Sequence, residues 1–259
     1  MYVLSADTAA KTASVCVCQL QNGVLKPLAH ATVNGTLTHS ESLMPMIDFC
    51  LHDAELSFRD LDAAVISVGP GSFTGVRIGV ATFKGLGFAR QDMPFIGVST
   101  LEALAYNLVS YPTGTVVFPV MDARRSQFYN AVFKTNGKGG VVRLGNDRVE
   151  AFDVLLADLK EHYAGKKIKL VGDGAELFLS LYEKSGDGSL SVSLCDPGDL
   201  YEDAYGVARC AKETLLSLKE GENAYPSRLL EPLYLRASQA ERERAEKTKT
   251  PQNTDDKKR

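Results

Sequence analysis

The sequence predicts an α/β fold that contains two copies of one βββαβα unit. The first observation behind this prediction is the order of elements, because three strands precede a helix and the later strands alternate with helices, which implies parallel pairing. The second observation is a repeat of two motifs in the same order. A strand that ends in aspartate leads into an alternating strand at residues 2–20 and again at 117–133. A strand that runs into a glycine-rich turn and a helix occurs after residue 64 and again after residue 168.

The first half divides into elements by its hydrophobic period and its turn residues. Residues 2–6 form a buried strand, residues 13–20 alternate as a second strand, and residues 24–33 follow the Asn22-Gly23 turn as a third, antiparallel one. The elements expected next are a helix over 42–54, a strand over 63–68, a helix over 75–90 and a strand over 95–98.

The second half repeats this plan and ends in a charged tail. Strands are expected over 117–121, 127–133 and 168–171, a helix over 199–219 that returns to pack on the first domain, and a last short strand over 229–235. The predicted domains are therefore residues 1–105 and 106–237. Residues 239–259 hold seven basic and five acidic side chains among 21, without apolar periodicity, so the tail over 238–259 is expected to be disordered.

The composition of the 259 residues excludes several classes of protein. With 44% hydrophobic and 24% charged residues, the chain can bury a core without disulfides or a structural metal. Its net charge of -3 argues against a surface that holds nucleic acid without a partner. The longest uncharged stretch, residues 103–121, contains proline and polar residues and so predicts no membrane span. No basic leader is visible, which predicts a cytoplasmic protein.

The segment over residues 69–79 is the most informative motif, since it follows a strand and opens a helix. It lacks the lysine of a Walker A loop and the third glycine of the dinucleotide fingerprint. Glycines permit a tight turn there, and free amides at the helix start can bind an anion. Two interpretations remain open, a phosphate-binding turn and a structural strand-to-helix turn. The candidate nucleotide or phosphate residues are Asp7, Gly69, Gly71, Ser72, Thr74, Gly75 and Arg77.

Two aspartates and four histidines are the candidate residues for metal binding or catalysis. Asp7 and Asp122 each end a strand at a hairpin, where an acid can hold a metal-bound phosphate or can form an Asx turn. The histidines form no metal-binding pair, and no Gly-x-Ser-x-Gly elbow occurs, so the sequence predicts neither a metal site nor a serine hydrolase.

The helices expected over 42–54 and 75–90 carry more apolar residues than one buried face requires. We interpret the excess as a subunit interface, with burial inside the same chain as the alternative. Gly75, Gly79, Thr82 and Leu86 would form a ridge of small residues along which another helix can approach. The expected interface residues are Leu43, Met46, Ile47, Cys50, Gly75, Val76, Gly79, Val80 and Phe83.

These residues together resemble the bacterial TsaB family, also called YeaZ. The stretches that carry the resemblance are Ala6-Asp7-Thr8, His39 to Pro45, Gly69 to Gly79, Ile96 to Leu101, Met121 to Arg124 and Pro232 to Arg236. They cover nearly the whole chain except the tail. The resemblance implies a duplicated actin-like ATPase fold, of the ASKHA and ribonuclease H-like kind.

The resemblance also implies a function. TsaB proteins are non-catalytic scaffolds that bind and activate TsaD, which transfers threonylcarbamoyl from threonylcarbamoyl-AMP to N6 of adenosine 37 in tRNAs that read codons beginning with A. The implied partners are TsaD in a heterodimer, the ATPase TsaE, and a second copy in a homodimer when the chain is alone. Contact with tRNA would occur only through the complex. No intrinsic cofactor is implied, and ATP or ADP would bind only at the shared complex.

The chain departs from the TsaD pattern at the positions that the transfer reaction would need. Thr100 and Leu104 stand where TsaD-like proteins carry a metal-binding histidine pair, and Lys11 stands where they carry an acid shortly after the first strand. Asp122 to Arg125 replace a Ser-Gly-Gly-His-Thr phosphate loop. The resemblance therefore implies no catalytic residues. The alternative function is a small-molecule kinase or phosphatase of the same fold, with Asp7 and the Gly69 turn at the nucleotide.

Overall fold

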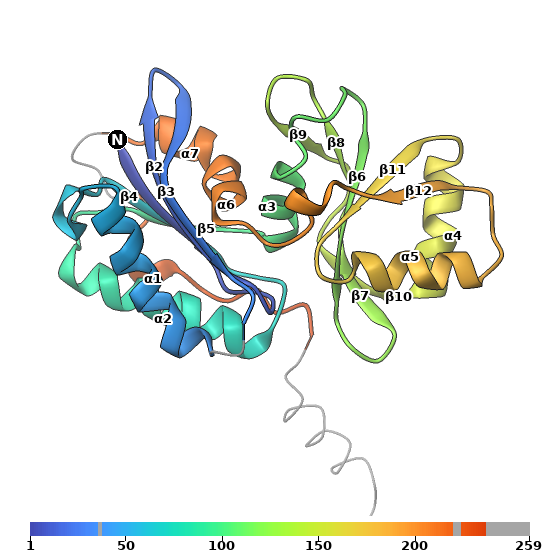
Figure 1. The fold of residues 1–259 in the computed structure, drawn as a ribbon, viewed down its shortest axis with the longest axis horizontal. Coiled ribbons are helices and arrows are strands. Elements are labelled where there is room, and N and C mark those ends of the chain that lie inside the picture. Colours follow the sequence, from blue (N-terminus) through green and yellow to red (C-terminus); the bar gives the residue numbers. More distant parts are fainter. Residues whose placement is uncertain (36–37, 220–223, 237–259) are drawn as a thin grey trace, which may run out of the picture.

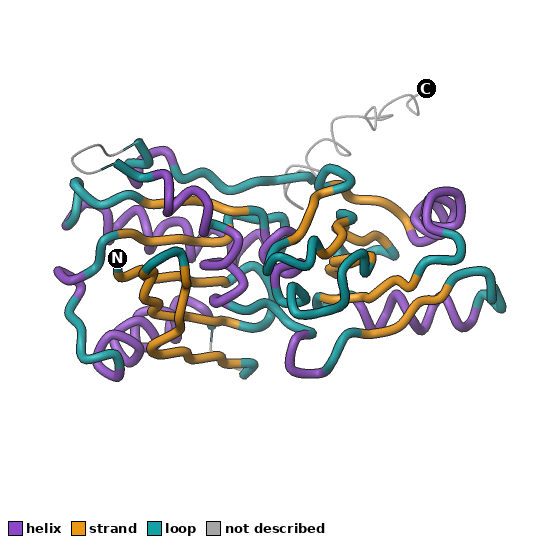
Figure 2. Tube along the Cα trace, turned by 90° about the horizontal axis from the view of Figure 1, so that it is seen from above, coloured by secondary structure: helices purple, strands orange, loops and turns teal. Residues whose placement is uncertain are grey.

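The computed structural model describes residues 1–35, 38–219 and 224–236, which form two α/β units side by side along the longest axis (Figures 1 and 2). The first unit contains β1 (Tyr2–Asp7), β2 (Ala13–Gln21), β3 (Val24–Val33), α1 (His39–Asp53), β4 (Ala63–Ser67), α2 (Phe73–Ala89), β5 (Phe95–Val98) and α3 (Thr100–Tyr106). The second contains β6 (Val116–Asp122), β7 (Gln127–Asn130), β8 (Phe133–Thr135), β9 (Val141–Arg143), β10 (Arg148–Ala151), α4 (Phe152–Tyr163), β11 (Lys167–Val171), α5 (Ala175–Lys184) and β12 (Ser191–Leu194). Helices α6 (Ala204–Cys210) and α7 (Lys212–Ser217) follow. The predicted disordered tail lies outside the described residues.

The two sheets have the same strand order, β3-β2-β1-β4-β5 in the first and β10-β7-β6-β11-β12 in the second. Strand β1 pairs antiparallel with β2 and parallel with β4, just as β6 pairs antiparallel with β7 and parallel with β11. This repeated topology is the ribonuclease H-like unit of actin-like ATPases. The duplicated actin-like fold predicted from the sequence is therefore confirmed.

The first sheet is covered on both faces, which explains the continuous apolar run of its central strands. Because side chains alternate along a strand, Leu4 and Ala6 pack in the same cluster as residues of α1 and α2. Val3 and Cys16 pack on the other face, in the cluster that includes α6. Figure 1 shows α1 and α2 on the outer side of this sheet and α6 on the side toward the second unit.

The helix predicted over 199–219 is shorter and divided in the structure. Residues 197–199 form a 3₁₀ turn, and α6 begins only at Ala204 because the Asp203 carboxylate caps its first amides, accepting from Tyr205 N at 2.7 Å. Helices α6 and α7 separate at Ala211. Helix α6 packs on β1, β2 and α3, so this late segment of the chain belongs to the core of the first unit.

Other predicted elements differ at their boundaries. Helix α1 begins at His39 and α2 at Phe73, each earlier than predicted. The strand predicted over 127–133 divides into β7 and β8, because these pair with different ends of β6 and extend toward β10 and β9 respectively. The segment predicted as a strand over 229–235 forms no ladder with the described residues, since Pro232 lacks an amide proton to donate.

No helix in the described part of the chain combines the length and the apolar character needed to cross a membrane.

Two glycines of α2 provide a matched stability test. A Cβ at Gly75 would overlap the backbone oxygen of Thr8, whereas a Cβ at Gly85 has no neighbour within 4 Å. Gly75→Ala is expected to lower the free energy of unfolding by about 1–3 kcal/mol through overpacking. Gly85→Ala is expected to raise it by about 0.5–1 kcal/mol through helix propensity. Urea unfolding of both variants measures these changes, and equal effects of the two would contradict the packing assigned to Gly75.

Candidate functional site

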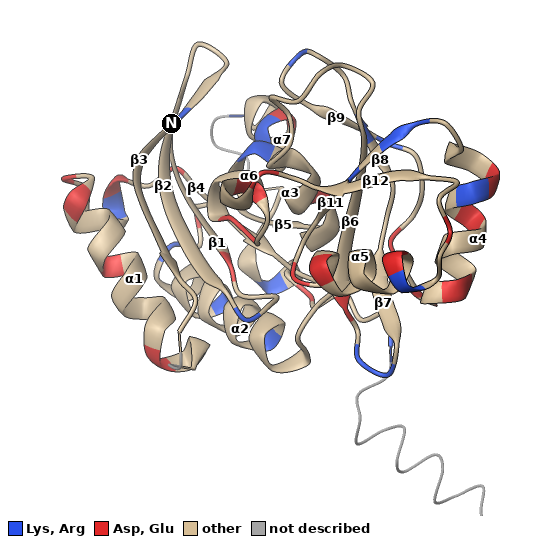
Figure 3. Cartoon of the chain, turned by 45° about the vertical axis from the view of Figure 1, so that its right-hand side comes forward, with Lys and Arg blue, Asp and Glu red and all other residues tan. Residues whose placement is uncertain are grey.

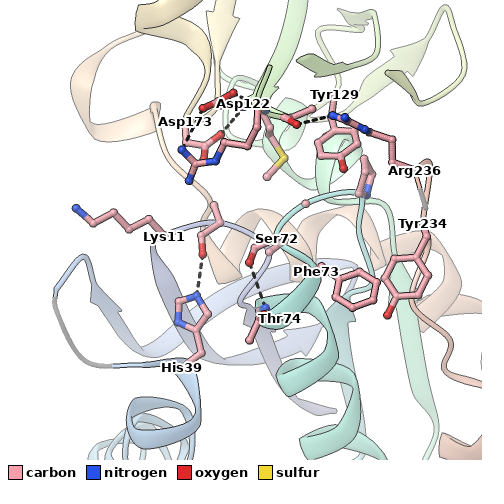
Figure 4. Close-up of a pocket in the computed structure, with 18 of the residues that line it drawn as sticks. Lys11, His39, Ser72, Phe73, Thr74, Asp122, Tyr129, Asp173, Tyr234 and Arg236 are labelled. Atoms are coloured by element: carbon pink, nitrogen blue, oxygen red, sulfur yellow. Dashed lines mark hydrogen bonds and ion pairs between the residues drawn. The ribbon is translucent and has the colours of Figure 1, made fainter. Parts of the chain in front are cut away.

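A cleft of about 590 Å³ lies between the two units (Figure 4). One wall consists of the β1–β2 turn, which carries Lys11, and the start of α2, which carries Ser72. The opposite wall consists of the ends of β6 and β11, which carry Asp122 and Asp173. A segment near the C-terminus, which includes Arg236, runs along the cleft. The cleft thus combines cations and acids from segments far apart in the sequence.

The structure brings only part of the predicted phosphate residues to this cleft. Those that line it are Gly71, Ser72, Thr74 and Gly75, whereas Asp7, Gly69 and Arg77 are not among the lining residues.

The glycines of the β4–α2 turn are required by contacts inside the chain. A Cβ on Gly71 would overlap the backbone oxygen of Ala9, and a Cβ on Gly75 would overlap that of Thr8. The Ser72 amide donates to the Ala9 oxygen at 2.6 Å, which holds the turn against the end of β1. These glycines therefore have a structural explanation that involves no phosphate. Of the two interpretations left open by the sequence, the geometry favours the structural turn.

Both aspartates at the strand ends form Asx turns. Asp7 Oδ1 accepts from the Ala9 amide at 2.8 Å, and Asp122 Oδ1 accepts from the Arg124 amide at 2.7 Å. Asp7 is fully buried, whereas Asp122 is partly exposed at the cleft. Each carboxylate thus has a local backbone role that is independent of any metal.

Two acids, Asp7 and Glu202, are buried where the units meet, and a third, Asp173, is exposed at the cleft. Burial raises the pKa of Asp7 to about 6, although the Ala9 amide and the charge of His39 oppose the shift. Desolvation by the surrounding protein raises the pKa of Asp173 to about 6, opposed by the hydrogen bond from the Asp122 amide. The pKa of Glu202 lies well above its usual value for the same reason, and its carboxyl oxygens have no hydrogen-bond partner among the described residues.

Residues 230–236, which we call the C-terminal strap, bind the first unit beside the start of α2. The Leu233 amide donates to the Val68 oxygen at 2.7 Å. The Tyr234 ring lies 4.8 Å from the Phe73 ring, and Arg77 Nε donates to the Tyr234 hydroxyl at 2.7 Å. The Arg77 guanidinium also stacks on the Phe73 ring at 3.5 Å. Arg77, predicted to meet phosphate, thus binds the strap instead.

The strap also contacts the second unit. Arg236 Nη1 donates to the backbone oxygen of Ala123 at 2.7 Å, close to the end of β6 (Figure 4). The strap therefore joins both sides of the cleft. The sequence predicted no role for Tyr234 or Arg236, although both lie in the stretch Pro232 to Arg236 that contributed to the family resemblance, and this motif was the only available signal.

The turn between β6 and β7 has an unusual backbone. Arg124, Arg125 and Ser126 have φ angles of 65°, 56° and 57°, so three successive residues other than glycine are left-handed. Such residues cost roughly 1–2 kcal/mol each relative to the right-handed conformation. The family resemblance noted in the sequence aligns this turn with the second phosphate loop expected of TsaD-like proteins.

The positions that correspond to the TsaD histidine pair are buried. Thr100 is 0% and Leu104 is 1% exposed, and both lie at α3 between the two units. His39 lies at the cleft, where Nε2 is 2.7 Å from the Ala10 oxygen (Figure 4). Among the described residues no group of three or more His, Cys, Asp or Glu could hold a metal ion.

The nine residues predicted to face a partner are instead buried in their own chain. Leu43, Ile47, Val76 and Phe83 are at most 2% exposed and pack on the sheet, and the others are also buried: Met46, Cys50, Gly75, Gly79 and Val80. The small-residue ridge faces inward too, because a Cβ at Gly79 would meet Thr8 and Ile66. Sequence periodicity could not show which apolar stripe faces the sheet. A charge at Val80, which is 3% exposed, would therefore unfold the chain rather than test an interface.

A different set of residues covers the outer surface of the same helices. We define the outer helix face as Met44 and Phe49 of α1 with Ala81, Gly85 and Phe88 of α2, all exposed. Phe49 is 56% and Phe88 is 80% exposed. Gly85 stands in the middle of α2 with no neighbour that a side chain would disturb. These exposed apolar residues lie beside the exposed Asp48 and His52 of α1, and Gly85 permits close approach of another helix.

Comparison with known proteins places this geometry in a family. A family model described as "TsaD: tRNA N6-adenosine threonylcarbamoyltransferase" matches residues 30–182. The chain is 32% identical over 161 residues to the "tRNA threonylcarbamoyladenosine biosynthesis protein TsaB" of Bacillus subtilis, covering 62% of this chain and 65% of the relative. It is 32% identical over 144 residues to the Escherichia coli protein of the same name, covering 54% and 58% respectively. The chain thus spans less than two thirds of these relatives.

Two solved structures share the fold over about nine tenths of this chain. "YeaZ from Pseudomonas aeruginosa" superposes with a TM-score of 0.65 at 24% identity, covering 90% of this chain and 99% of that one. A second Pseudomonas aeruginosa structure, described as similar to peptidase YEAZ, superposes with a TM-score of 0.70, also at 24% identity, covering 91% and 99%.

The buried Asp7 predicts a pH dependence of stability. Its pKa is higher in the folded state, about 6, than the usual 3.8, so the folded state binds more protons between these values and stability falls as pH rises through them. The wild type should lose up to about 1.4 kcal/mol per pH unit from this group. Asp7→Asn keeps the acceptor for the Ala9 amide and should be more stable than the wild type at pH 7.5, with a smaller difference at pH 4. Urea unfolding at both values checks this, and a constant difference would contradict the burial effect.

Proposed function

Because this chain belongs to the TsaD family, in its TsaB (YeaZ) group, we propose that it is the non-catalytic subunit of a tRNA threonylcarbamoyladenosine synthesis complex. It binds and activates a TsaD-type transferase, which moves threonylcarbamoyl from threonylcarbamoyl-AMP to N6 of adenosine 37 in tRNAs that read codons beginning with A. The observation that carries the proposal is the outer helix face, an exposed apolar surface on two adjacent helices.

The outer helix face has the features of a protein interface. Its aromatic residues Phe49 and Phe88 are of the type enriched at interface centres, and both lie away from the core of their own chain. Gly85 is destabilising in an exposed helix, and no contact inside the chain requires it. A partner helix that packs closely over Gly85 explains its presence. The same face would pair with a second copy when the transferase is absent.

A scaffold role agrees with the residues at the transferase positions. Thr100 and Leu104 provide a hydroxyl and an alkyl group where the transferase pattern has histidines, and both are buried. At the second phosphate loop the Asp173 carboxylate already accepts from the Asp122 amide. We therefore assign the chemistry, and any ATP or ADP, to the shared complex of this chain with the transferase and the ATPase TsaE. Its contact with tRNA would likewise depend on that complex.

A small-molecule kinase or phosphatase is the second candidate, because the cleft between the units lies where actin-like enzymes bind nucleotide. The packing of Gly71 and Gly75 against backbone oxygens counts against it. ATP hydrolysis by the isolated chain would support this candidate.

Reconstitution tests the scaffold role. A purified mixture of TsaD, TsaE, the threonylcarbamoyl-adenylate synthase, ATP, threonine, bicarbonate and tRNA is assayed for modified adenosine with and without this chain. Product is expected only when the chain is present, and none from the chain alone. Equal product without the chain would contradict the assignment.

Charge on the outer helix face should prevent assembly. Phe49→Glu and Phe88→Glu place a carboxylate in a desolvated interface and are each expected to weaken binding to the transferase at least about tenfold. Leu177→Glu on α5 is the matched control, since Leu177 is 44% exposed on the second unit.

Isothermal titration with the transferase measures these affinities, and thermal unfolding checks that the variants fold. Equal affinity of both phenylalanine variants and the control would show that the interface lies elsewhere.

A further inference from the structure

The turn between β6 and β7 contains three successive residues with positive φ angles, Arg124, Arg125 and Ser126. The local sequence contains no glycine, which would adopt these angles without strain. The turn is held by short-range bonds, since the Arg124 amide donates to Asp122 and the Gln127 amide donates to the Arg124 oxygen at 3.2 Å. A strained backbone that persists through such support is typical of a functional position.

This conformation places two guanidinium groups in solvent. Arg124 has 86% of its side chain exposed, and Arg125 and Ser126 are exposed as well. Arg124 forms an ion pair with Asp122 at 3.6 Å, which is long and is screened by water. Figure 3 shows the basic tip at the lower end of the second unit, close to where the strap leaves the cleft. The two arginines thus have little role in holding their own chain together.

Further cations from other segments surround the same opening. Lys11 of the β1–β2 turn is exposed and lines the cleft with Arg124, and Arg236 of the strap reaches the carbonyl of Ala123, the residue before the turn. Two acids, Asp122 and Asp173, lie among these cations, and each accepts a hydrogen bond from a backbone amide. Lys11, Arg124, Arg125 and Arg236 outnumber these two acids at the opening, although the whole chain has a net charge of -3.

The arrangement suits a phosphodiester backbone better than a free nucleotide. Exposed arginines at a convex tip can each contact a phosphate of an extended strand, whereas a nucleotide needs an enclosed pocket with free amides. The glycine turn at α2, which would supply those amides, packs on Thr8 and Ala9 instead. Arg124 lines the cleft, whereas no residue of the outer helix face does, so the two surfaces are separate.

We infer that Arg124 and Arg125, at the left-handed turn, hold the phosphate backbone of the RNA substrate while the chain is assembled with the transferase. This inference rests on the proposed function and adds a direct RNA contact from this subunit. Because the body of the chain is acidic, the contact contributes binding and orientation within the complex rather than strong binding by the chain alone.

The test compares two double variants of the full chain. Arg124→Gln with Arg125→Gln removes the charges at the turn, and Lys138→Gln with Lys184→Gln removes two exposed charges elsewhere on the second unit. Each protein, alone and mixed with the transferase, is titrated into a fluorescein-labelled unmodified tRNA transcript. The fluorescence anisotropy is recorded at KCl concentrations from about 50 to about 200 mM. Thermal unfolding confirms that both variants fold.

In the mixture, the arginine variant is expected to bind tRNA about tenfold more weakly at low salt. The slope of log affinity against log salt concentration should be smaller in magnitude by about one to two. The lysine control should match the wild type. Equal tRNA binding by the arginine variant and the wild type in the mixture would overturn the inference. A loss of ATP or tripolyphosphate binding without a loss of tRNA binding would also overturn it, in favour of a small-anion site.

Size-exclusion chromatography with the transferase separates the two proposals. The arginine variant should still assemble, so weaker tRNA binding by an intact complex supports the contact. Failure of the wild type to assemble would contradict the proposed function, whatever the chain alone does with tRNA.

Discussion

The whole architecture depends on the close contact between a glycine turn and the end of the first strand in each unit. In the first unit Gly71 and Gly75 lie against the backbone of Ala9 and Thr8, and Thr8 Oγ1 donates to the Gly75 oxygen at 2.8 Å. In the second unit a Cβ on Gly174 would lie 2.8 Å from the Asp122 amide, and the Gly174 amide donates to Val120 at 3.0 Å. No side chain fits between these backbones. The contact sets how the following helix leaves the sheet, and hence where the cleft and the outer helix face lie.

The duplication is visible in this contact at the level of single backbone angles. Gly69 and Gly172, the first glycines of the two turns, have φ angles of 111° and 107°. The two units then diverge in what surrounds the turn. The first meets the strap, whose Leu233 oxygen would lie 2.6 Å from a Cβ at Gly69, while the second places the Asp173 carboxylate beside Asp122. The same glycine geometry thus forms a structural joint in both units.

The glycine turns and the acids at the cleft are therefore engaged in contacts within the chain. Asp7 and Asp173 accept hydrogen bonds from backbone amides, and Tyr234 of the strap binds Arg77. Two features are not explained by these contacts: the outer helix face, which lies outside the cleft, and the arginine turn, of which Arg124 lines the cleft. A subunit that joins a protein partner on one side and a polyanion on the other would need this arrangement.

The sequence by itself determined the fold class, the repeat and the order of most elements, because strand alternation and glycine turns are local signals. It also identified the motifs over residues 69–79 and 232–236, but it could not determine their role. Only the tertiary structure decided that Leu43, Val76 and Phe83 face the sheet while Phe49 and Phe88 face outward, since a helix that is apolar on most sides carries no mark of its orientation. The structure also decided that Arg77 meets Tyr234, a contact between residues 157 positions apart. Such pairings depend on how the two units close around the strap, which no local pattern encodes.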